Sequence, residues 1–84
     1  MKRIAAFALG FMILASTAAY ACIGKAQAQA HALAAVHGGT VVLTTFEGGD
    51  KPPHWSVDIR KSANVEDEVW VDCSGKILRI IRGQ

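Results

Sequence analysis

The sequence predicts an α+β domain in which one N-terminal helix packs on a three- to four-stranded antiparallel meander sheet, as two layers. Lys25–Val36 is rich in Ala and Gln and contains neither Pro nor Gly, which favours a helix. Residues 54–60 and 66–73 alternate polar and apolar side chains, as strands with one apolar face do. A sheet with one apolar face has to cover it, and a single helix is available to do so.

Glycine and proline divide the rest of the chain into strands. Gly38-Gly39 ends the helix, residues 48–53 (GGDKPP) form a turn, and Ser74-Gly75 forms a tight turn. The expected strands are Thr40–Glu47, His54–Arg60, Glu66–Cys73 and Lys76–Arg82. The apolar positions of the two alternating strands are expected in the core, namely Trp55, Val57, Val69 and Val71.

The first residues have the composition of a secretory signal peptide. Lys2 and Arg3 form a positive start, an apolar run follows, and Ala19-Tyr20-Ala21 is a small-x-small cleavage site. We therefore expect a signal peptide at 1–21, a mature domain at 22–84, and a periplasmic or secreted location. Cleavage as late as Ala28 or Ala30 stays open. A retained membrane anchor stays open too, because the uncharged stretch of 21 residues from 4 to 24 is long enough to cross a bilayer.

The charge of the mature part argues against nucleic-acid binding. The chain has nine basic and seven acidic residues, and Lys2 and Arg3 supply the whole net charge of +2. The remainder is formally neutral, and its basic residues are scattered rather than gathered into one patch. Nucleic-acid binders carry a concentrated basic face, so we expect no nucleic-acid partner.

The two cysteines allow three outcomes in an exported chain. Cys22 and Cys73 can pair, because disulfides persist in oxidising compartments. Cys22 can instead be lipidated after cleavage at Ala21, although Tyr20 and Ala19 make a poor lipidation signal. Both thiols can also stay free. Residues alone leave these outcomes open.

The sequence offers no group of residues with catalytic spacing. The three histidines His31, His37 and His54 are dispersed, and no HExxH or CxxC pattern occurs. His31 and His37 lie six positions apart, about 240° around a helix, so they share no face. We expect a non-enzyme with no catalytic, cofactor-binding or metal-binding residue and no cofactor.

The chain from about Lys25 to Arg82 resembles the PepSY domain family. The resemblance rests on the alanine-spaced helix, on Gly38-Gly39-Thr40-Val41-Val42, on residues 51–57 (KPPHWSV), and above all on residues 69–78 (VWVDCSGKIL). In the last stretch the family-like structural motif is Val71, Asp72, Gly75 and Lys76. Asp72 can accept hydrogen bonds from its own turn and Gly75 can adopt positive φ, so the motif indicates a fold rather than a reaction.

The resemblance implies a small exported, non-catalytic domain that binds or restrains a peptidase or another envelope protein. Trp70 lies on the face opposite the expected core and is a candidate partner contact, although it can also pack over a neighbouring strand. The alternative is a structural or assembly component of the cell envelope. That component is anchored to the membrane only if the leader is retained or Cys22 is lipidated.

Overall fold

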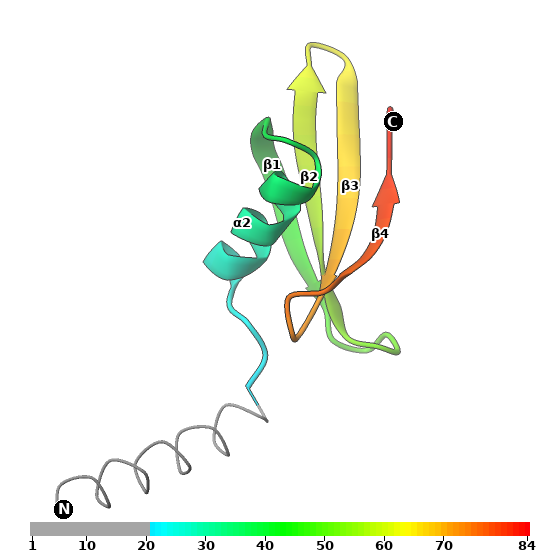
Figure 1. Cartoon of the computed structure of the whole chain (residues 1–84). Coiled ribbons are helices and arrows are strands. Elements are labelled where there is room, and N and C mark those ends of the chain that lie inside the picture. The colour runs from blue at the N-terminus through cyan, green and yellow to red at the C-terminus, as the bar shows by residue number, and fades with distance from the viewer. Residues whose placement is uncertain (1–20) are drawn as a thin grey trace, which may run out of the picture.

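The computed structural model describes residues 21–84 as one helix and four strands (Figure 1). The elements are α2 (Lys25–Ala35), β1 (Thr40–Glu47), β2 (His54–Ser62), β3 (Val65–Asp72) and β4 (Ile77–Ile81). The strands form one antiparallel sheet in the order β1-β2-β3-β4. The predicted signal peptide, apart from Ala21, lies outside the described residues.

The two strands with alternating polar and apolar residues bury their apolar side chains. Val57, Val69 and Val71 are fully buried, which confirms their predicted place in the core, and Ile59 joins them. Trp55 is half-buried at the edge of this cluster. Val57 and Val69 are cross-strand partners, as are Trp55 and Val71, so the inner face is built from directly opposed apolar pairs.

The helix contributes small side chains to the same core. Ala28, Ala32 and Val36 are the buried residues that this segment supplies. At its start, the Gly24 amide donates to Gln27 Oε1 over 3.0 Å, which satisfies one free amide of the helix N-terminus. At its end, Lys61 Nζ donates to the carbonyl oxygens of Val36 and Gly38, and this cation lies where the helix dipole is negative.

The predicted fold class needs correction in one respect. The predicted arrangement, one N-terminal helix packed on the sheet to make two layers, is wrong: α2 begins only at Lys25, and the described chain is mostly sheet. The physical reason is length, since eleven helical residues span about 16 Å, whereas strands of eight or nine residues reach roughly 27–31 Å. The coarser description, an α+β domain with a four-stranded antiparallel sheet, holds.

Gly39 allows the chain to pass from the helix into β1 against the sheet. Its φ is +127°, a conformation that side chains other than glycine rarely adopt. A Cβ atom at this position would lie 2.6 Å from Ile59 Cγ2 and 2.8 Å from the Arg60 carbonyl oxygen. Glycine is therefore required here by both conformation and space.

Candidate functional site

Strand β1 is an edge of the sheet with little to protect it. It pairs with β2 on one side only, and within residues 21–84 no strand pairs with its other side. Its side chains Leu43, Phe46 and Val42 are 57%, 43% and 38% exposed, and Glu47 is its single charged residue. Edge strands are usually shielded by charge, proline, bulges or short length. The pairing of β1 with β2 shifts register once, at Val42, and the residues from Leu43 to Glu47 form a regular, mostly uncharged edge that is available for pairing.

A groove of about 230 Å³ runs along this edge beside the helix. Lys25 and Gln29 of α2 form one wall, and residues 41–44 of β1 form the other. Gln29 Nε2 donates to Thr44 Oγ1 over 2.9 Å and ties the two walls together. The edge therefore offers backbone groups for pairing together with a recess for side chains. We call this the β1 edge surface: β1 with Lys25 and Gln29.

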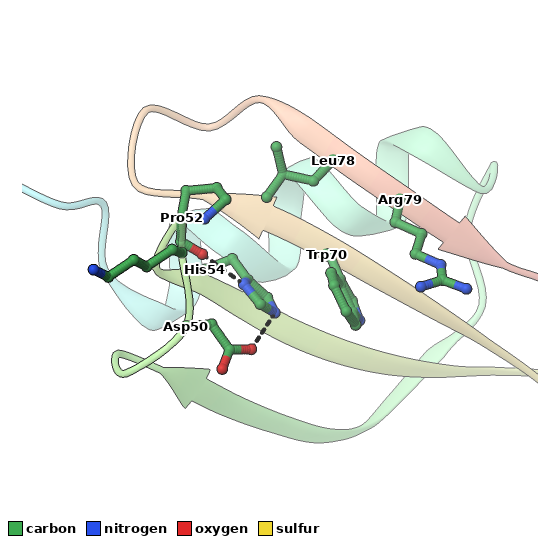
Figure 2. Close-up of a pocket in the computed structure, with 7 residues that line it drawn as sticks. Asp50, Pro52, His54, Trp70, Leu78 and Arg79 are labelled. Carbon is green, nitrogen blue, oxygen red and sulfur yellow. Dashed lines mark hydrogen bonds and ion pairs between the residues drawn. The ribbon is translucent and has the colours of Figure 1, made fainter.

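A second recess, of about 310 Å³, lies on the outer face of the sheet (Figure 2). We call it the Trp70 groove. Its lining comes from the turn before β2 and from β2, β3 and β4, and consists of Asp50, Lys51, Pro52, His54, Trp70, Leu78 and Arg79.

Trp70 is held in this groove by its neighbours on both adjacent strands. Its ring stacks on the His54 ring, with centroids 4.3 Å apart and planes 19° from parallel. The Arg79 guanidinium carbon lies 5.3 Å from the Trp70 centroid, a cation–π distance, and Figure 2 draws His54 and Arg79 on opposite sides of the indole. The half-buried Trp70 thus packs across the outer face of the sheet.

Glu68 fixes the edge of the same indole. Its Oε2 atom accepts hydrogen bonds of 2.8 Å from Trp70 Nε1 and from Ser56 Oγ. These bonds, the one from Trp70 first, lower the pKa of the Glu68 carboxyl below its ordinary value. Glu68 is therefore a charged acceptor that sets the orientation of Trp70.

His54 is the buried polar group of this groove. It is 2% exposed, and its Nδ1 lies 3.0 Å from the Pro52 carbonyl oxygen. Because a carbonyl only accepts, Nδ1 carries the proton and neutral His54 has a lone pair on Nε2. No group within residues 21–84 hydrogen-bonds to Nε2, and Asp50 Oδ2 lies 3.8 Å from it.

The turn predicted from the family-like motif forms around Asp72. Asp72 Oδ1 accepts hydrogen bonds from Ser74 N at 2.9 Å, Ser74 Oγ at 2.7 Å and Lys76 N at 2.9 Å. Hydrogen bonding by Ser74 is the main cause that lowers the pKa of the Asp72 carboxyl. Gly75 takes φ +94°, and a Cβ there would lie 2.9 Å from His31 Nε2, so the helix also packs on this turn.

Replacing Asp72 by Ala is expected to lower the free energy of unfolding by about 1–2 kcal/mol at neutral pH, because three donors lose a charged acceptor that is partly screened by solvent. The folded-state pKa lies below the ordinary value of 3.8. The stabilisation is therefore complete above that value and is lost as pH falls through the lowered folded pKa. Urea unfolding of the unchanged protein and of Asp72→Ala at neutral and at acidic pH measures this contribution to stability.

Asp72→Asn is the matched control for this turn, because it keeps an acceptor oxygen and removes the charge. It should lose less stability than Asp72→Ala at neutral pH. If Asp72→Ala is equally destabilising, relative to the unchanged protein, in neutral and in strongly acidic solution, the ionised carboxylate is not what stabilises the turn.

Cys22 and Cys73 form a disulfide. Two hydrogen bonds reinforce this attachment: the Ile23 amide donates to the Cys73 carbonyl oxygen over 3.0 Å, and Trp55 Nε1 donates to the Ile23 carbonyl oxygen over 3.0 Å. Of the three outcomes left open by the sequence, the described structure has the paired one. The segment before α2 is thereby joined to the end of β3.

The predicted site residues fall into separate places. Asp72, Gly75 and Lys76 share the turn, Val71 lies in the core, and Trp70 lines the outer groove. Sequence reasoning missed His54 and Asp50, because strand alternation assigned His54 to the solvent side. The available signal was the spacing Asp50-Lys51-Pro52-Pro53-His54, in which a proline turn returns a carboxylate to the histidine.

The described part of the chain contains no cluster of three or more His, Cys, Asp or Glu side chains arranged to hold a metal ion. Within residues 21–84, no helix has both the length and the apolar character needed to cross a membrane.

Comparison with known proteins finds no matching family model, no matching curated protein and no matching solved structure. The PepSY resemblance therefore stays a prediction that rests on the residues given above.

Proposed function

We propose that this chain is a small exported, non-catalytic domain that binds a partner protein outside the cytoplasm, and that the partner adds an extended segment to the free edge of β1. A peptidase restrained in this way is one such partner, as the PepSY resemblance implies. Strand addition supplies main-chain hydrogen bonds along the edge and places alternate side chains of the partner on the two faces of the sheet.

The exposure of the β1 edge carries the proposal. Val42, Leu43 and Phe46 are exposed on a strand whose only charge is at its end. The opposite edge, β4, is five residues long and has an arginine at its centre, which makes it a poorer template. The groove beside α2 adds a recess along residues 41–44, where a bound segment can place side chains.

Two further features support export. The leader-like composition of the first residues is one. The other is the disulfide between Cys22 and Cys73, a bond that persists in oxidising compartments and is rare in reducing ones. A partner outside the cytoplasm is consistent with both.

The test places a photo-crosslinking residue at Leu43 of the full chain in the cell that produces it, and identifies the products by mass spectrometry. We expect crosslinks to one partner protein. A second substitution, Val42→Lys, should reduce that product at least about tenfold, because a buried lysine in the new strand pair is strongly unfavourable.

The matched control for this experiment is Val65→Lys. Val65 is 37% exposed, close to the 38% of Val42, but lies at the β2–β3 hairpin. Val65→Lys should leave the Leu43 crosslink unchanged. Equal loss with both lysines contradicts docking at β1, and crosslinks from Leu43 to copies of this chain alone favour the alternative role as an envelope assembly component.

A further inference from the structure

The Trp70 groove contains two acceptor atoms that face one another without a donor from the described residues. His54 Nε2 is buried and lacks a hydrogen-bond partner within residues 21–84, and Asp50 Oδ2 lies 3.8 Å from it. With its proton on Nδ1, the imidazole presents a lone pair to a carboxylate. Two such atoms repel unless something positive or hydrogen-donating lies between them.

We propose that His54 Nε2 and Asp50 Oδ2 form a binding site for a divalent transition-metal ion, with Zn²⁺ as the first candidate. Imidazole nitrogen is a ligand that suits zinc, copper and nickel, whereas calcium and magnesium prefer oxygen ligands. The site is independent of strand addition at β1, because it lies on the outer face of the sheet and strand addition uses the free edge.

The separation of the two atoms fits a bridging metal ion. Zinc bonds to nitrogen and to carboxylate oxygen are about 2.0–2.2 Å long, so laid end to end they slightly exceed the observed 3.8 Å and fit it in a bent arrangement. A water donating to both atoms would hold them about 4.4 Å apart, and a direct charged hydrogen bond would bring them to about 2.8 Å.

The surroundings of His54 match those of metal-binding histidines. The hydrogen bond from Nδ1 to the Pro52 carbonyl selects the tautomer whose Nε2 is free, and stacking on Trp70 fixes the ring (Figure 2). Asp50 lies on the turn, and its side chain is 57% exposed, so it can move the few tenths of an ångström needed for a tetrahedral angle, and solvent ions can reach it.

The nearby charges act in both directions. Glu47 of β1 and Asp72 of β3 are the cross-strand partners of His54, so their side chains emerge on the same face and add negative charge. Lys51 and Arg79 line the groove and oppose a cation, but both are exposed and carry their charge at the end of long side chains. With two protein ligands in the described chain, water takes the remaining metal positions.

The test is a titration of Zn²⁺ into the protein purified after expression of the full chain, followed by calorimetry and by the ring nitrogen resonances of the histidines. We expect saturable binding that shifts the Nε2 resonance of His54 and leaves its Nδ1 protonated. Asp50→Asn and His54→Gln should each weaken Zn²⁺ binding at least about tenfold.

Two variants keep this test decisive. His31→Gln removes an exposed helical histidine and should leave Zn²⁺ binding unchanged. Asp50→Asn changes an exposed turn residue and so tests the site even if replacing the buried His54 impairs folding. The proposal is overturned if Zn²⁺ produces no shift at His54 up to millimolar concentration, or if Asp50→Asn leaves the affinity unchanged.

Discussion

Replacing Cys22 and Cys73 together by Ser is expected to lower the free energy of unfolding by about 4 kcal/mol. The two residues are 51 positions apart, and a cross-link over that loop length removes roughly this much conformational freedom from the unfolded chain. Small domains are marginal, because they bury a smaller fraction of their surface than large ones. We therefore expect the double variant to be largely unfolded at about 37 °C.

Urea unfolding of the oxidised protein, the reduced protein and the double variant checks this expectation. The reduced protein and the variant should coincide, and the variant should not respond to reductant. A loss below about 1 kcal/mol would show that the hydrogen bonds of Ile23 to Cys73 and to Trp55 hold the segment without the covalent bond.

We expect that a chain beginning at His31 does not fold and that a chain beginning at Cys22 does. The shorter chain, which corresponds to cleavage after Ala30, loses the disulfide, the acceptor of the Trp55 indole and the fully buried Ala28. Only five helical residues remain before the helix ends at Ala35, fewer than an isolated helix needs. The combined loss exceeds the roughly 5 kcal/mol of a marginal domain.

Circular dichroism and proton NMR of the two chains check this result, with the N-terminus of the exported protein determined by mass spectrometry. We expect mature protein beginning at Cys22. A stably folded chain beginning at Gln29 or His31 would contradict the packing argument, because it would show that the sheet does not need Ala28 or the segment before it.

The local chemistry of the sequence was enough to predict much of the sheet. The observed strand bounds agree closely with the predicted ones, and Val57, Val69 and Val71 are buried as their alternation requires. The turn from Asp72 to Lys76 also follows from its own residues, because a carboxylate, a serine and a glycine make these hydrogen bonds within five positions. Strand alternation and tight turns depend on residues that are close together in the chain, and these can be read directly from the sequence.

The position of the helix could be predicted from the sequence, but its packing could not. Propensity placed it correctly along the chain, but its length relative to the strands meant that it could not form a full second layer. Whether Cys22 meets Cys73 was likewise undetermined, since three outcomes satisfied the residues and only the path of the chain before α2 brings the sulfurs together.

His54 shows most clearly the difference between what the sequence predicts and what the tertiary structure decides. Its position in an alternating strand put it on the outer face, and it does lie there, yet it is buried. The cover comes from Trp70 on the next strand and from the turn that carries Asp50 and Pro52. Sequence alone determined the strands, the inner face and the Asp72 turn, because these follow from period and local hydrogen bonding. Only the tertiary structure decided which polar atoms lost their water, because burial depends on side chains from several elements converging on one point.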